Sequence, residues 1–284
     1  MSFRISKNSP IIEAQYQLNK ILDFSSTDTK DLFEFNKKIQ GEEWIYYNKK
    51  IEYKYNSWGY RTKEFSELSD DYILIFGCSF TEGIGLHYDD MWSTKLGKKL
   101  NLDVFNLGMG ASGADYQFYN TILFQNFILE KKKLPKLVVY QWPMPFRTSA
   151  FFKLREDNKT DLIMEFFSPN FIEETGEKKV MNSFNEWFKD GFINDGGDLI
   201  KQNYLYPMSC NNVWKSLNVP VINWTYDEDF ENLNDEIFDL NFQIHRINDD
   251  TMVRGRDLMH NGHLAQDLVV NKIIENLNNY GFSK

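Results

Sequence analysis

Three polar residues have the types and the setting that nucleophilic catalysis requires. Ser79 lies in YILIFGCSFTEGIGL (72–86), where five apolar residues run into a glycine-rich turn. A serine hydroxyl is a poor nucleophile until a base takes its proton, and that base can come from anywhere in the chain. In GRDLMHNGHLAQDL (255–268), Asp257 precedes His260 by three residues. This spacing lets the carboxylate bind one ring nitrogen while the other faces Ser79.

Acyl transfer also requires hydrogen-bond donors for the oxyanion that develops on the carbonyl group. The segment NLGMGASG (106–113) can offer the backbone N–H of Gly110 or Ala111, and the N–H of Ser79 adds another. Taken alone, however, a Gly-x-Ser-x-Thr-x-Gly turn is equally typical of a phosphate-binding loop. Asp257 and His260 favour the nucleophile over a plain turn serine.

The elements that must position these residues alternate along the chain. Residues 72–76 form a short continuous apolar run, which is typical of a strand buried on both faces. Further strands are predicted at 102–105, 136–142 and 219–224, and amphipathic helices at 89–100, 116–129 and 264–277. Strand and helix in alternation predict an α/β fold with a parallel sheet, whose functional groups gather at the carboxyl ends of the strands.

The length of 284 residues fits one core with additions. Residues 1–70 are polar and aromatic without clear periodicity, and we expect an N-terminal extension that packs on the core formed by 71–284. An insertion at about 147–210 interrupts the alternation with aromatic and charged residues. It could form the wall of a pocket, although packing against the core is the more common role of such phenylalanines.

Four segments, in order, resemble the blocks of the SGNH (GDSL-type) serine hydrolases. LIFGCSFTEGIG is similar to the serine block, FNLGMGASG to the glycine block and RDLMHNG to the closing Asp-x-x-His block, while VVYQWP lies at the third block. The resemblance implies a flavodoxin-like three-layer α/β/α sandwich and ester chemistry without a metal or an organic cofactor. It makes Ser79 the nucleophile, His260 the base and Asp257 its partner, with Gly110 or Ala111 at the oxyanion.

Two departures from the family pattern bear on the site. Cys78 stands where an aspartate usually precedes the serine, which removes no catalytic group. The Gly-x-Asn-Asp of the third block is missing, and the local candidates for its side-chain donor are Gln141 and Trp142. Loss of one such donor costs about 10² to 10³ in rate. We therefore expect this departure to slow catalysis and to leave the fold unchanged.

Composition excludes several classes of partner. A net charge of −9 argues against nucleic acid or an anionic membrane surface. Two cysteines make a disulfide scaffold improbable, and no apolar stretch predicts a signal peptide or a membrane span, so we expect a cytoplasmic protein. His263 lies three residues after His260, but no acidic or histidine cluster completes a set of metal ligands.

Two neighbours of these motifs carry open interpretations. Thr81 and Glu82 are expected to cap the helix that leaves the serine turn. Arg147 could bind a carboxylate or a sugar acid, but a structural ion pair is equally consistent with the sequence.

The leading hypothesis is a serine esterase that acts on an O-acyl group, such as acetyl on a carbohydrate. Acyl transfer to a polysaccharide, a non-catalytic carbohydrate-binding protein and a nucleotide-binding flavodoxin-like protein are the alternatives. The sequence leaves open the acyl group, the acceptor and the oligomeric state.

Overall fold

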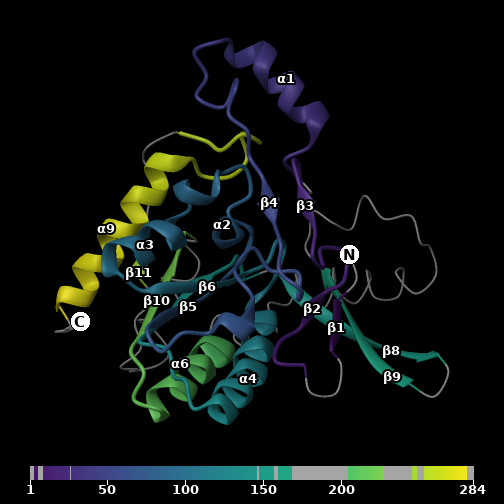
Figure 1. Cartoon of the computed structure of the whole chain (residues 1–284), viewed down its shortest axis with the longest axis vertical. Coiled ribbons are helices and arrows are strands. Elements are labelled where there is room, and N and C mark those ends of the chain that lie inside the picture. The colour runs from purple at the N-terminus through teal and green to yellow at the C-terminus, as the bar shows by residue number, and fades with distance from the viewer. Residues whose placement is uncertain are drawn as a thin grey trace.

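A five-stranded parallel sheet lies at the centre of the molecule (Figure 1). The computed structural model describes residues 3–5, 9–25, 27–145, 147–156, 159–167, 204–226, 245–247 and 253–279. The strands of the sheet, in spatial order, are β11 (His245–Arg246), β10 (Val221–Thr225), β7 (Leu137–Trp142), β5 (Tyr72–Gly77) and β6 (Asp103–Gly108).

This strand order confirms the predicted α/β fold with a parallel central sheet. When the five strands are numbered by their order along the chain, their spatial order from β6 to β11 is 2-1-3-4-5, which is the flavodoxin-like arrangement. All four neighbouring pairs are parallel. The four predicted strands are confirmed to within three residues at each end, whereas the two-residue strand β11 was not predicted.

Helices cover both faces of the sheet, as a three-layer sandwich requires. Helices α3 (Trp92–Leu100) and α9 (His263–Asn279) cover one face, and α4 (Ala114–Lys131) and α6 (Tyr206–Ser216) cover the other (Figure 1). The three predicted helices are confirmed as α3, α4 and α9. Helix α6 was not predicted, because its first residues fall in the region expected to be an insertion.

The continuous apolar run of β5 follows from this layering. Leu74 and Phe76 belong to the hydrophobic cluster that includes residues of α4 and α6, while Ile73 and Ile75 belong to the cluster that includes residues of α3 and α9. Side chains alternate across a strand, so a strand covered on both faces needs an apolar residue at every position.

The N-terminal extension and the insertion meet in a second sheet. Its order is β2 (Glu13–Ala14), β1 (Phe3–Ile5), β9 (Lys159–Phe167) and β8 (Thr148–Glu156), with all neighbouring pairs antiparallel. The extension also contains α1 (Lys30–Gln40) and a two-stranded sheet of β3 (Ile21–Leu22) and β4 (Tyr53–Lys54). Much of the predicted insertion, at 168–203, lies outside the described residues.

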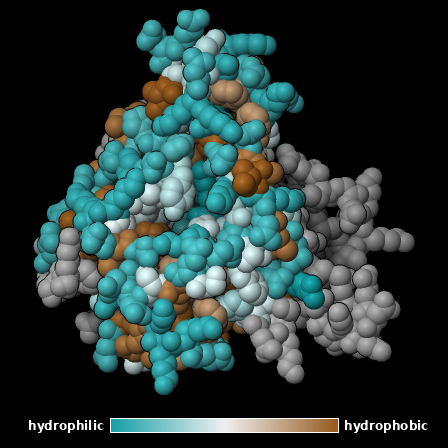
Figure 2. Space-filling model, in the orientation of Figure 1, coloured by the Kyte–Doolittle hydropathy of each residue, from teal (hydrophilic) through white to brown (hydrophobic). Residues whose placement is uncertain are grey.

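The extension also contributes to the core itself. Ile11, Ile12 and Tyr60 are fully buried in the cluster beneath α4 and α6. The face seen in Figure 2 is mostly hydrophilic, with its apolar residues in several separate patches. Within the described ranges, every helix is too short or too polar to cross a bilayer.

The layering predicts how strongly α9 contributes to stability. Ile273 is fully buried against the sheet, so Ile273→Ala should lower the free energy of unfolding by about 2 to 5 kcal/mol. Urea denaturation followed by tryptophan fluorescence measures this loss. Lys272→Ala, at the exposed neighbouring position, should stay within about 0.5 kcal/mol of the wild type. Equal losses in the two variants would contradict the packing of this helix.

Candidate active site

Ser79 lies on a tight turn at the carboxyl end of β5, between β7 and β6 in the parallel sheet. Cys78 is extended and forms the N-cap of α2 (Ser79–Glu82), a single helical turn that Gly83 ends with φ 78°. Ser79 is 8% exposed. A Cβ on Gly77 would lie 2.1 Å from Thr81 Oγ1, so only glycine allows the helix to turn back so closely. The glycines around the serine are therefore needed for the turn itself.

Asp257 and His260 are brought together by one short turn. Asp257 Oδ2 lies 2.6 Å from His260 Nδ1, and its Oδ1 accepts hydrogen bonds from the N–H groups of Met259 and His260, each at 3.1 Å. Burial alone would raise the pKa of Asp257, but the hydrogen bonds and the charge of His260 outweigh it and hold this pKa below its ordinary value. An ionised carboxylate at Nδ1 orients the ring and leaves Nε2 available.

The Asp–His turn packs directly against the serine turn. Arg256 N donates to Gly85 O at 2.8 Å, and a Cβ on Gly85 would lie 2.9 Å from Asp257 Oδ1. The Phe80 ring contacts the His260 ring edge-on, with centroids 4.9 Å apart. Ser79 and His260 themselves form no hydrogen bond in the structure, so their catalytic pairing stays a prediction. Such contacts commonly tighten only when substrate binds.

The glycine-rich loop lies beside Ser79 but one of its donors is occupied. A Cβ on Gly110 would lie 4.0 Å from Ser79 Cβ. The Gly110 N–H, however, donates to Glu82 Oε2 at 2.6 Å. Ala111 follows in the left-handed region with φ 62°. Of the two predicted oxyanion donors, Gly110 is thus near the serine, but it would have to release Glu82 before it could bind a substrate.

Glu82 has a different role from the one expected. It does not cap α2; the cap is Cys78, and no side chain bonds there. The Glu82 side chain is buried and accepts from Tyr55 Oη at 2.8 Å and Gln17 Nε2 at 3.2 Å, in addition to Gly110 N. Burial raises its pKa, and these hydrogen bonds only partly offset that rise. Thr81 is not a cap either, since its hydroxyl donates to Gln141 Oε1 at 3.2 Å.

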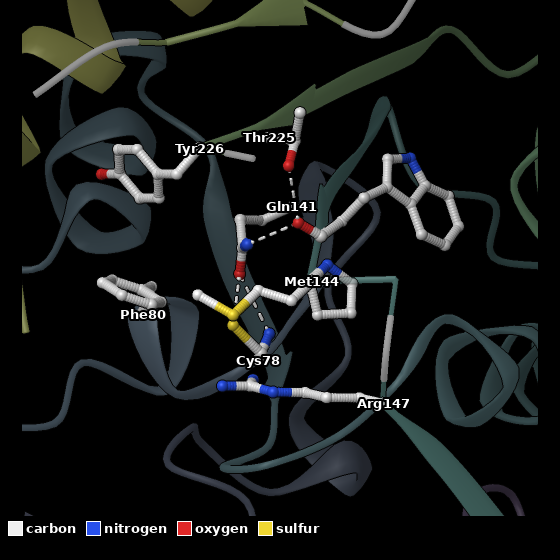
Figure 3. Close-up of a pocket in the computed structure, with 9 residues that line it drawn as sticks. Cys78, Phe80, Gln141, Met144, Arg147, Thr225 and Tyr226 are labelled. Atoms are coloured by element: carbon white, nitrogen blue, oxygen red, sulfur yellow. Dashed lines mark hydrogen bonds between the residues drawn. The ribbon is translucent and has the colours of Figure 1, made fainter. Parts of the chain in front are cut away.

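The two candidates from the third block make structural hydrogen bonds. Gln141 Oε1 accepts from Cys78 N at 3.0 Å, and its Nε2 donates to Trp142 O at 2.8 Å (Figure 3). Trp142 Nε1 donates to Asn223 Oδ1 at 3.0 Å. The indole has no second N–H, whereas the Gln141 amide does. Of the two, Gln141 is therefore the side chain that retains a donor.

A buried arginine from the N-terminal extension holds the serine turn. Arg61 is 1% exposed and donates to the carbonyl oxygens of Gly83 at 2.6 Å and Leu86 at 2.9 Å. It also donates to Glu82 O at 3.3 Å. Gly83 and Leu86 follow the one-turn helix α2, so the guanidinium fixes the chain just beyond Ser79.

A second buried arginine holds the Asp–His turn. Arg256 is 2% exposed and forms an ion pair with Asp28, with Nη2 2.7 Å from Oδ2. The guanidinium also lies over the rings of Phe24 and Phe33, at 4.6 and 5.0 Å from their centroids. Thr27 Oγ1 donates to Asp257 Oδ2 at 3.2 Å. The sequence did not reveal these partners, because Asp28 and Arg256 are 228 residues apart.

A small pocket opens beside the serine turn (Figure 3). Its volume is about 230 Å³, and it lies at the carboxyl ends of β7 and β10. Cys78 and Phe80, on either side of Ser79, belong to its lining, which is completed by Gln141, Trp142, Pro143, Met144, Arg147, Thr225 and Tyr226. The Phe80 ring, which lines the pocket, also contacts the rings of His260 and Tyr226.

The described residues offer no cluster of three or more His, Cys, Asp or Glu that could hold a metal ion. His263 is the first residue of α9. Cys78 and Cys210 are both buried and form no disulfide.

Comparison with known proteins adds little to this picture. No protein-family model matches the chain, and no curated protein matches it. Among solved structures, the chain is similar to an acetyl xylan esterase (Est2A) from the rumen bacterium Butyrivibrio proteoclasticus, with a TM-score of 0.42 and 14% sequence identity. The match covers 75% of this chain and 65% of that one, which is less than two thirds of the esterase. Likeness at this level does not identify the residues that act in this chain.

The buried ion pair predicts a strong dependence of stability on its two members. Asp28→Asn leaves Arg256 buried without its counter-ion and should lower the free energy of unfolding by roughly 3 to 5 kcal/mol. In the double variant Asp28→Asn/Arg256→Met the loss should be smaller than the sum of the two single losses, because no unpaired charge remains. Chemical denaturation of all four proteins gives this coupling. Additive losses would show that the two side chains do not interact.

The raised pKa of Glu82 predicts a pH-dependent stability. A carboxyl group whose folded-state pKa exceeds its unfolded value stabilises the fold fully below the unfolded pKa and loses this contribution as the pH rises through the folded pKa. The stability of the wild type relative to Glu82→Gln should therefore increase as the pH is lowered from 7.5 to 5, as measured by urea titrations. Asp89→Asn is the control, because the pKa of Asp89 is lowered. The stability of the wild type relative to Asp89→Asn should therefore decrease slightly as the pH is lowered. A pH-independent difference for Glu82 would contradict the raised pKa.

Proposed function

We propose that the protein is a serine ester hydrolase of the SGNH type that cleaves an O-acyl ester through an acyl-enzyme on Ser79. The observation that supports this most is the buried Asp257–His260 pair, with Nδ1 and Oδ2 2.6 Å apart, on a turn that packs against the serine turn. A nucleotide cradle would have no use for such a pair. We further propose an acetyl ester on a carbohydrate as the substrate class, from the family resemblance.

The chemistry divides among the described residues. His260 Nε2 takes the proton of Ser79 Oγ as the oxygen attacks the ester carbonyl, and Asp257 stabilises the imidazolium that forms. Collapse of the tetrahedral intermediate expels the alcohol, which receives that proton from His260. Water, deprotonated by the same nitrogen, then attacks the acyl-enzyme and releases the acid and Ser79.

The oxyanion is assigned to backbone donors and one amide. The N–H of Ser79 lies at the first turn of α2, where N–H groups have no partner within the helix. Ala111 supplies a second donor without displacing Glu82, and the remaining N–H of Gln141 is a candidate for the third. We expect slower turnover than in a site with a dedicated asparagine, because one donor contributes about 10² to 10³ in rate.

Covalent labelling tests this proposal directly. The wild type should react with a fluorophosphonate probe and hydrolyse 4-nitrophenyl acetate, and Ser79→Ala should abolish both. Asp257→Asn should keep the fold but lower kcat by about 10³ to 10⁴, because the ring loses its orienting carboxylate. Intact-mass analysis and initial rates measure the two effects.

The matched control is Ser66→Ala, an exposed serine that should label like the wild type. A label that persists in Ser79→Ala, or no label on the folded wild type, would contradict both hydrolysis and acyl transfer through Ser79. A non-catalytic carbohydrate-binding protein would then be the remaining alternative. If labelling succeeds, addition of a polysaccharide acceptor distinguishes transfer from hydrolysis through the acylated product.

A further inference from the structure

Arg147 is a positively charged residue of the pocket lining, and it forms no ion pair with any described residue. It follows β7 and lines the 230 Å³ pocket beside the serine turn. Its Nη1 is buried and has no hydrogen-bond partner. In Figure 3 the side chain extends across the pocket toward Cys78. The structural ion pair that the sequence also allowed is not present among the described residues.

Among the described residues that line the pocket, none gives this guanidinium a negative charge. The nine lining residues include no aspartate or glutamate. The nearby Asp115, which could have paired with it, instead accepts from the hydroxyl of Ser149 at 2.7 Å and its N–H at 2.6 Å. Arg147 is thus the only charged residue among those lining residues.

A buried guanidinium nitrogen without a partner loses its hydration, and that loss is recovered only if a ligand supplies an acceptor. Guanidinium groups bind carboxylates through two parallel hydrogen bonds, which gives both strength and orientation. The apolar lining from Phe80, Trp142 and Met144 suits the carbon skeleton next to such a group. The pocket is smaller than the usual 300 to 1,000 Å³ of ligand sites, which suits a single ring rather than a polymer segment.

We propose that Arg147 binds a carboxylate on the substrate, so that the preferred ester is one whose alcohol part carries a negative charge, such as an O-acylated acidic sugar. This inference rests on the proposed function for the position of the scissile bond. Cys78 and Phe80, the two chain neighbours of Ser79, line the pocket, which places the Arg147 site beside the serine turn. Arg147 is a specificity residue and takes no part in the proton transfers.

The kinetic test compares a negatively charged aryl acetate with a neutral one. 4-Acetoxybenzoate carries a carboxylate on its leaving alcohol, and methyl 4-acetoxybenzoate is its neutral counterpart. The ratio of kcat/KM for the charged ester to that for the neutral ester should fall about 10- to 100-fold in Arg147→Gln, which is the usual effect of losing a charged hydrogen bond. Arg147→Lys should retain part of the ratio, because it keeps the charge but not the paired donors.

Two controls separate the binding of charge from other effects. Lys131→Gln removes one positive charge at the exposed end of α4, and its ratio should equal that of the wild type. Circular dichroism and Tm show whether each Arg147 variant is folded. An unchanged ratio in a folded Arg147→Gln protein would overturn the proposal.

A binding measurement keeps this proposal distinct from the catalytic one. Calorimetry with Ser79→Ala and free 4-hydroxybenzoate should detect binding that is lost in Ser79→Ala/Arg147→Gln, whether or not the wild type hydrolyses esters. Benzenesulfonate and phenyl phosphate, used as further probes, should bind more weakly than 4-hydroxybenzoate. Tighter binding of either would overturn the carboxylate preference, and the absence of binding by all three would overturn the pocket as an anion site.

Discussion

Two buried guanidinium groups hold the site together, and the rest of its geometry depends on them. Arg61 fixes the chain just beyond Ser79 through the carbonyl groups of Gly83 and Leu86. Arg256 fixes the turn that carries Asp257 through its ion pair with Asp28. Both interactions involve the N-terminal extension. Tyr53 joins them, since its hydroxyl donates to Asp28 and accepts from Gly85 N. The parallel sheet determines where the site lies, while the extension determines how the serine turn and the Asp–His turn face each other.

The sheet was predictable because its strands bury both faces. An apolar residue at every position from 72 to 76 is typical of a strand covered on both faces, and the same pattern recurs at 137–140. The Asp–His contact was predictable for a related reason. Three residues on one turn leave little freedom, so the spacing of Asp257 and His260 almost determines their hydrogen bond.

The extension was not predictable, because its role depends on contacts distant in sequence. Asp28 looks like any surface carboxylate until Arg256 is known to lie beside it. Glu82 is similar: its position after the serine favours a helix cap, and only Tyr55 and Gly110 show that it is buried. The direction of an amide side chain is equally hidden. Gln141 was a candidate donor by position, yet its oxygen is the atom that faces Cys78 and the serine turn.

The pairing of β1 with β9 constrains the order in which the protein can form. Phe3 pairs with Met164, so β1 has no partner on this side until residues 159–167 have been made. Contacts between such distant segments form slowly, because the entropy of closing a long loop is lost before the contacts stabilise the fold. The exposed edge of β1 and the apolar side chain of Phe3 are therefore open to wrong partners during synthesis. Strands β5, β6 and β7 precede β9 in the chain, so this part of the parallel sheet can begin to assemble before β1 has that partner.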